Sequence, residues 1–124
     1  MNSVLENIKN RRSVRSYKTD PVPKELIQQV IEAGNFAPTG NNRQAWRFVV
    51  VTDAVMRCKL YETAYANWKK VFDNIKKNNP EHYESVKHYG EMKDPVYYEA
   101  PCVVFVIGQG PIDNAMVTEN MMLA

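Results

Sequence analysis

The sequence has few of the residues that mark specialised protein classes. It contains two cysteines, Cys58 and Cys102, and neither belongs to a C-x-x-C pair or to a cluster with histidine. The sequence therefore predicts neither a disulfide framework nor a metal site, and we expect two buried, reduced thiols. The longest apolar run, from Cys102 to Ile107, is far shorter than the about 20 residues that span a bilayer, so no membrane partner is predicted.

A charge of predominantly one sign is also missing. Sixteen basic and fourteen acidic residues are mixed along 124 positions and leave a formal net charge of +2. A nucleic-acid-binding domain carries a larger and more segregated basic excess, so no nucleic-acid partner is predicted. The amino terminus begins with polar residues rather than an apolar leader, and no repeat or low-complexity tract interrupts the chain. We expect one cytoplasmic domain over residues 1–124, long enough for a sizeable core.

Helix signals are clear in the first third of the chain. Ser3 and Glu6 have the spacing of a capping box, which predicts a helix over about residues 4–10. Pro23 suits the first position of a second helix, whose apolar stripe includes Leu26 and Ile27. Gly34 is the expected end of this helix.

The middle of the chain predicts a long helix followed by a short one. Asp53 is a candidate N-cap, and apolar residues recur at helical spacing from residue 60 to residue 75. Asn79 followed by Pro80 predicts a new start, with a weakly patterned helix to about residue 89. The long helix carries an aromatic stripe that we assign to core packing: Tyr61, Tyr65, Trp68 and Phe72.

Two segments have the composition of β-strands. Residues 48–51 combine an aromatic and three β-branched residues and predict a buried strand. Residues 102–108, Cys-Val-Val-Phe-Val-Ile-Gly, are apolar on both faces, which predicts a central strand covered on each side. A final helix-compatible segment runs from residue 112 to Ala124 and lacks any C-cap, so we expect that the fold continues beyond it.

A local basic run over residues 11–15, Arg-Arg-Ser-Val-Arg, has two interpretations. Arg11 and Arg12 follow the first helix, where positive charge complements the helix dipole. Alternatively, the run binds a phosphate, because each charge-assisted hydrogen bond contributes about 1.5 to 3 kcal/mol. Two or three such bonds supply roughly 5 kcal/mol, whereas micromolar affinity needs about 8 kcal/mol. A second binding element is therefore required.

The loop over residues 37–48, Ala-Pro-Thr-Gly-Asn-Asn-Arg-Gln-Ala-Trp-Arg-Phe, is a candidate for that element. Its amide and hydroxyl side chains both donate and accept hydrogen bonds. Gly40 allows the backbone to approach a planar ring, and the following strand would hold the loop rigid. Loops of this composition also serve as plain connections between a helix and a strand.

The order and spacing of these motifs resemble the amino-terminal part of the nitroreductase family of FMN-dependent oxidoreductases. The R-x-S-x-R run, the Val-Pro helix, the A-P-[ST]-x-x-N-x-Q-x-W loop, and the later "EAPCVVFVIG" and "TENMMLA" segments cover almost the whole chain. The resemblance implies an α+β fold, a mixed-sheet α/β/α sandwich, that assembles as a homodimer with FMN at each of two interfacial sites. It also implies ping-pong transfer of two electrons from NAD(P)H to a small acceptor such as a nitroaromatic compound or a quinone.

The same resemblance implies the residues that bind FMN. Arg11, Arg12 and Ser13 correspond to contacts with the phosphate and ribityl groups, and Arg15 to a cation at the pyrimidine edge of the flavin. A fixed cation there stabilises the negative charge of the reduced ring, so no separate catalytic acid, base or nucleophile is nominated. The partner subunit is expected to contribute its loop residues Pro38, Thr39, Gly40, Asn42 and Gln44.

The sequence departs from the family pattern in two ways. Ala45 replaces the proline that commonly precedes the tryptophan, which should loosen the loop without removing a contact. The resemblance also implies a carboxy-terminal part that lines the flavin and supplies a late basic pair, and residues 1–124 do not include it. A non-catalytic remnant or flavin-binding module is therefore an alternative to the enzyme. A third reading is a regulatory domain that binds another phosphate-bearing ligand, although no Gly-rich phosphate loop is present.

Overall fold

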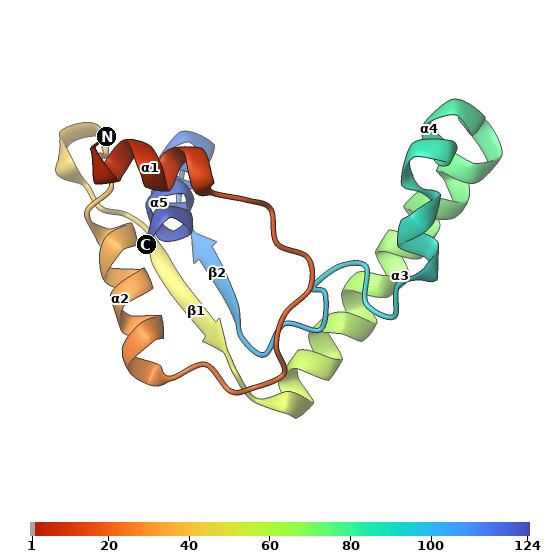
Figure 1. Ribbon diagram of the computed structural model, residues 1–124, viewed down its shortest axis with the longest axis horizontal. Helices are drawn as coiled ribbons and strands as arrows, with labels where there is room; N and C mark the ends of the chain where they lie inside the picture. Colours follow the sequence, from red (N-terminus) through yellow and green to blue (C-terminus); the bar gives the residue numbers. More distant parts are fainter. Residues whose placement is uncertain (1) are drawn as a thin grey trace. The chain divides into compact units, whose positions relative to one another are not determined.

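A computed structural model of the protein describes residues 2–124, and Figure 1 shows the order of its elements. Helices alternate with two strands and two short 3₁₀ turns. The elements are α1 (Ser3–Asn10), α2 (Lys24–Asn35), η1 (Gly40–Asn42), β1 (Arg47–Val51), α3 (Ala54–Asn78), α4 (Pro80–Val86), η2 (Lys87–Glu91), β2 (Val103–Ile107) and α5 (Pro111–Leu123).

The chain divides into two compact units. The first contains residues up to Val14 together with Pro21–Val50 and Val104–Ala124, and the second contains Arg15–Asp20 and Val51–Val103. The boundary falls inside the basic run. Arg15 consequently belongs to a different unit from Arg11, Arg12 and Ser13.

The core of the first unit lies where the sheet meets α5 and the end of α2. Among residues 2–124, the buried hydrophobic side chains are those of Ala37, Trp46 and Val117, and Val117 is fully buried. Phe48 from β1, Val106 from β2 and Met121 from α5 pack against these three. The sequence predicted a sizeable core, whereas this core is small.

The sheet consists of two neighbouring strands, β1 and β2, whose arrows run in opposite directions in Figure 1. The sequence predicted a buried first strand and a second strand covered on both sides. Both predictions were wrong, because each strand has exposed apolar side chains. Val49 is 44% exposed and Ile107 is 54% exposed. A two-stranded sheet leaves one edge of each strand unpaired and is only marginally stable by itself. The described residues therefore cover only part of the apolar surface that these two strands present.

The ends of the first two helices differ by one residue from the predictions. Asn2, not Ser3, is the N-cap of α1, and its Oδ1 accepts a 2.8 Å hydrogen bond from the N–H of Val4. Helix α2 continues through Gly34 to Asn35. Gly34 is buried, and a Cβ at this position would lie 3.0 Å from Cγ of Met121, so its small size serves close packing with α5 rather than helix termination.

The second unit is built on the long helix α3, and its predicted caps are confirmed. Oδ1 of Asp53 accepts from the N–H of Met56 at 2.8 Å, and Oδ1 of Asn79 accepts from the N–H of His82 at 3.1 Å. Helix α4 lies beside α3 (Figure 1). The expected aromatic stripe forms a continuous series of ring contacts with spacings of 4.7 to 5.5 Å: Tyr61, Tyr65, Trp68, Phe72 and, from α4, Tyr83.

The cysteines only partly follow the prediction. Both are free thiols, but Cys58 is exposed on α3 and Cys102 is partly buried. Between residues 2 and 124, no helix has the combination of length and hydropathy that crossing a bilayer requires.

Candidate cofactor-binding site

The first half of the predicted site is the segment that follows α1. Arg12 folds back on the helix, because its Nη1 donates to the carbonyl oxygens of Lys9 at 2.7 Å and of Arg11 at 2.8 Å. Helix capping therefore occupies one nitrogen of Arg12. The guanidinium of Arg11 is partly exposed and has no hydrogen bond or ion pair among residues 2–124. Arg11 consequently offers all of its side-chain donors to an anion.

The second half of the predicted site is the loop over residues 38–44, which has a strained backbone. Asn41, Asn42 and Gln44 have φ angles of 55°, 51° and 47°, in the left-handed region that non-glycine residues avoid. Asparagine tolerates this region, whereas glutamine does so at a cost on the order of 1 kcal/mol. Gly40 does not adopt a positive φ, so it is not needed for the turn. Strain of this kind is concentrated at functional sites.

Two hydrogen bonds hold this loop in place. Oγ1 of Thr39 donates to Oδ2 of Asp113, at the start of α5, with a separation of 2.8 Å. At the far end of the loop, Nε1 of the buried Trp46 donates to Oδ1 of Asn35 at 2.9 Å. The loop is thus tied to both α5 and α2, while most of its other side chains remain exposed.

Within the first compact unit, the segment after α1 and the loop over residues 38–44 are not brought together. In Figure 1 the segment after α1 leaves that helix at the end remote from the loop over residues 38–44. Arg15 belongs to the second compact unit. The described chain does not test the expectation that the two halves of one site come from two subunits, which stays a prediction.

The groups at these positions fit the chemistry of FMN. An unpaired guanidinium at Arg11 suits a phosphate, and the exposed amides of Asn42 and Gln44 suit the polar edge of a flavin ring. A Cβ added to Gly40 would meet only Nη2 of Arg43, at 3.9 Å. The space above Gly40 is therefore open to a planar ligand.

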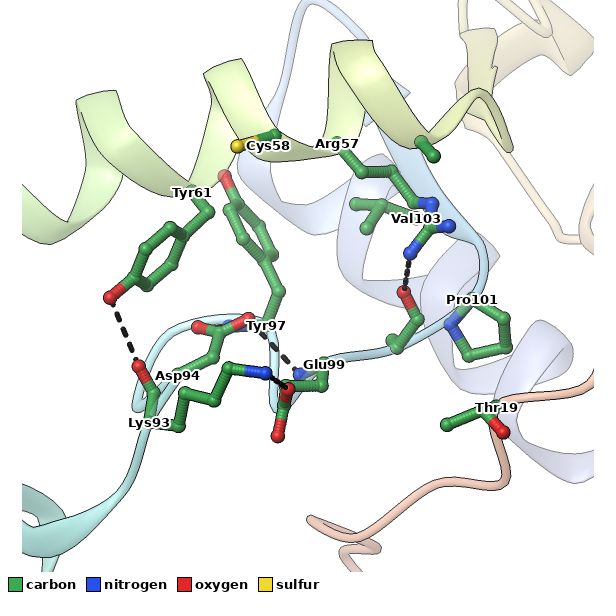
Figure 2. A pocket seen from close by; sticks show the side chains of 12 residues that line it. Thr19, Arg57, Cys58, Tyr61, Lys93, Asp94, Tyr97, Glu99, Pro101 and Val103 are labelled. Atoms are coloured by element: carbon green, nitrogen blue, oxygen red, sulfur yellow. Dashed lines mark hydrogen bonds and ion pairs between the residues drawn. The ribbon is translucent and has the colours of Figure 1, made fainter.

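The second unit contains a cavity of about 400 Å³ that the sequence did not predict (Figure 2). Arg57 fixes one side, since its Nε donates to the carbonyl oxygen of Thr52 at 3.2 Å and its Nη1 to that of Ala100 at 3.1 Å. The hydroxyl of Tyr61 donates to the carbonyl oxygen of Lys93 at 3.0 Å. Desolvation, together with the nearby Tyr65 and other groups, raises the pKa of Tyr61.

One thiol of this unit, that of Cys102, has a pKa that burial shifts from its ordinary value. Burial raises this pKa, and the positive charge of Arg57 opposes that rise only in part. Cys102 is therefore a poor nucleophile at neutral pH. Across residues 2–124, no group of three or more acidic, cysteine or histidine side chains is arranged to bind a metal ion.

A buried acid organises the loop that borders this cavity. Asp94 is 9% exposed, and its carboxylate accepts three backbone hydrogen bonds. Oδ1 accepts from the N–H groups of Val96 at 3.0 Å and Tyr97 at 2.8 Å, and Oδ2 accepts from that of Glu99 at 3.0 Å. We refer to residues 94–99 as the Asp94 loop. The sequence signal for it was an aspartate before proline, which favours a turn.

Comparison with known proteins identifies relatives of the whole chain. Residues 8–124 match the sequence model of the Nitroreductase family. A crystal structure of a nitroreductase with bound FMN from Bacteroides fragilis is 31% identical, with a TM-score of 0.70, and the match covers 99% of this chain and 64% of that chain. The α+β fold implied by the motifs is therefore confirmed.

Shorter stretches match curated proteins more closely. Over 55 residues, 44% of this chain, it is 46% identical to an NADH dehydrogenase from Thermus thermophilus, of which the match covers 27%. Over 57 residues, 46% of this chain, it is 44% identical to iodotyrosine deiodinase 1 from Rattus norvegicus, of which the match covers 20%. The chain spans less than two thirds of each of these relatives.

Proposed function

This chain belongs to the nitroreductase family, and from that premise we propose that it is an FMN-dependent oxidoreductase. Its reductant would be NAD(P)H and its oxidant a small molecule such as a nitroaromatic compound or a quinone. The single observation that carries the proposal is that the family match over residues 8–124 includes both halves of the predicted site. When bound, FMN would supply the transfer of two electrons between the two substrates.

The proposed role of the chain is to bind the cofactor and to tune its charge. Arg11, with its unpaired guanidinium, would hold the phosphate, and Ser13 and the remaining donors of Arg12 would support it. Arg15 would place positive charge at the pyrimidine edge, where it stabilises the reduced ring. The loop residues Pro38, Thr39, Gly40, Asn42 and Gln44 would contact the same cofactor from the partner subunit of a homodimer.

The strain and exposure of the loop support this role. The left-handed backbone of Gln44 costs free energy, and strain of this kind is concentrated at functional sites. The hydrogen bond from Thr39 to Asp113 keeps the loop in that geometry.

The test is an absorbance spectrum of the purified protein after incubation with FMN and removal of excess cofactor. Retained flavin colour that bleaches on anaerobic addition of NADH or NADPH supports the enzyme. Retained colour without bleaching supports the alternative, a non-catalytic flavin-binding module. No retained flavin contradicts the proposal and favours a remnant or a binder of another phosphate ligand.

The oxidant can be assigned in the same assay. Once the flavin is reduced, a nitroaromatic compound, a quinone and 3-iodotyrosine are added separately, and reoxidation is followed without oxygen. The halogenated compound is included because one relative is named a deiodinase. The fastest reoxidation identifies the acceptor class.

A further inference from the structure

The Asp94 loop lies against the segment that carries Arg15. Although Arg15 follows Arg11 closely in sequence, Arg15–Asp20 belongs to the compact unit formed with Val51–Val103. The segment and the loop enclose a cavity of about 310 Å³. The residues that line it include, from the segment, Arg15, Tyr17 and Thr19 and, from the loop and its flank, Asp94, Tyr98 and Glu99. The surroundings of Arg15 are thus set by a distant part of the chain.

Asp94 braces the loop wall of this cavity through a hydrogen bond to the backbone. Tyr98 and Glu99 have φ angles of 56° and 55°, so two consecutive non-glycine residues adopt the left-handed conformation. Such a pair is unfavourable by itself and persists where the surroundings enforce it. The bond from the N–H of Glu99 to Oδ2 of Asp94, 3.0 Å long, provides that enforcement.

We propose that Asp94 is a positioning residue for Arg15, an inference that rests on the proposed function. By fixing Tyr98 and Glu99, Asp94 keeps in place the part of the cavity wall that the Arg15 segment shares. The guanidinium of Arg15 is thereby held where it stabilises the negative charge of the reduced flavin. Asp94 itself contacts no substrate in this scheme.

The proposal predicts the sign of a change in reduction potential. Removing the carboxylate of Asp94 has two opposing effects. Loss of a nearby negative charge favours the reduced, anionic ring and raises the midpoint potential. Displacement of Arg15 withdraws a positive charge from the ring and lowers the midpoint potential. Positioning through Arg15 therefore predicts a lower potential, whereas a direct charge effect predicts a higher one.

The experiment measures the two-electron midpoint potential of bound FMN in the full chain by equilibration with a reference dye. In Asp94→Asn an amide N–H₂ replaces an oxygen that accepts hydrogen bonds, so the loop is disturbed. We expect about a tenfold loss of reduced-flavin stabilisation, which corresponds to a potential about 30 mV more negative. The matched control is Glu84→Gln, because Glu84 is an exposed acid that pairs with Lys87 outside the Asp94 loop. This control removes the same charge and should leave the potential unchanged or slightly raised.

A double-mutant cycle tests whether Asp94 acts through Arg15. Arg15→Gln alone should lower the potential by at least as much as Asp94→Asn. The double variant should then show no further decrease, because the second change has nothing left to displace. Additive shifts would contradict the proposal.

Asp94→Glu provides a variant without a change of charge, should Asp94→Asn fail to fold. Its longer side chain moves the carboxylate and should also lower the potential. If the unmodified chain retains FMN and neither Asp94 variant lowers the potential, the inference is wrong and the proposed function stands. If both Asp94 variants fail to fold while Arg15→Gln folds, Asp94 is only structural and the inference is likewise overturned. If the unmodified chain does not retain FMN, the proposed function fails first.

Discussion

The hydroxyl of Thr39 donates a hydrogen bond to the carboxylate of Asp113, with 2.8 Å between Oγ1 and Oδ2. The two residues are far apart in sequence, and the bond joins the candidate cofactor loop to the first turn of α5. Because the loop is strained, a contact that holds it should matter for binding. The relationship therefore connects a feature of the fold to affinity for FMN.

Replacing Thr39 by valine should weaken FMN binding about fivefold, since a typical hydrogen bond contributes about 1 kcal/mol. Quenching of FMN fluorescence measures the dissociation constant. Thr63→Val is the matched control, because the hydroxyl of Thr63 donates only to the Lys59 carbonyl within α3, at 3.0 Å. Equal affinities for the two variants would show that the bond does not organise the site.

Arg11→Ala should weaken FMN binding by at least tenfold, since one charge-assisted hydrogen bond contributes about 1.5 to 3 kcal/mol. The control is Lys69→Ala, which removes an exposed positive charge that pairs with Asp73 on α3. Equilibrium dialysis with FMN compares the two. The phosphate assignment fails if both variants bind as the unmodified chain does.

Val117→Ala should lower the free energy of unfolding by about 2 kcal/mol, because it leaves a cavity at a fully buried position. Met116→Ala, at the neighbouring position, should have a much smaller effect, since Met116 is 44% exposed. Urea titration followed by circular dichroism measures both values. Similar losses would mean that the packing around Val117 is not the core of the first unit.

Cys102 should react with iodoacetamide more slowly than an ordinary thiol until the pH is well above the usual thiol pKa, because burial raises its pKa. The Cys58→Ser variant isolates this reaction, and the same variant unfolded in urea is the reference. Since the folded state keeps the proton longer than the unfolded state, this thiol contributes stability at neutral pH that is lost as the pH rises through the folded pKa. An identical pH profile before and after unfolding would refute the shift.

The sequence predicts those parts of the fold whose causes are local. Asp53 and Asn79 could be identified as caps because their side chains bond to backbone within three residues. Asn2 rather than Ser3 is the first cap, and because both residue types cap well, the sequence pattern alone does not select between them. Local preference cannot distinguish such neighbours.

Features that depend on distant residues could not be predicted. The apolar strands indicated burial, but burial requires covering elements, and Val49 and Ile107 lack them among the described residues. The composition of residues 11–15 and 38–44 left their role open, and it was their order and spacing, which resemble those of a known family, that marked them as a candidate site. The division that separates Arg15 from Arg11 depends on segments far apart in the chain. The same holds for the cavity that the Arg15 segment and the Asp94 loop line together.

The central claim, that Arg11 of one chain and the loop of another form one cofactor site, is tested most directly by mixing two defective variants. Arg11→Ala and Asn42→Ala dimers are prepared separately, shown not to retain FMN, then unfolded, mixed in equal amounts and refolded together. Random pairing makes half of the dimers mixed, and each mixed dimer has one intact site, so retained FMN should recover to about one quarter of the unmodified level. No recovery, in a mixture shown to contain mixed dimers, would contradict the account.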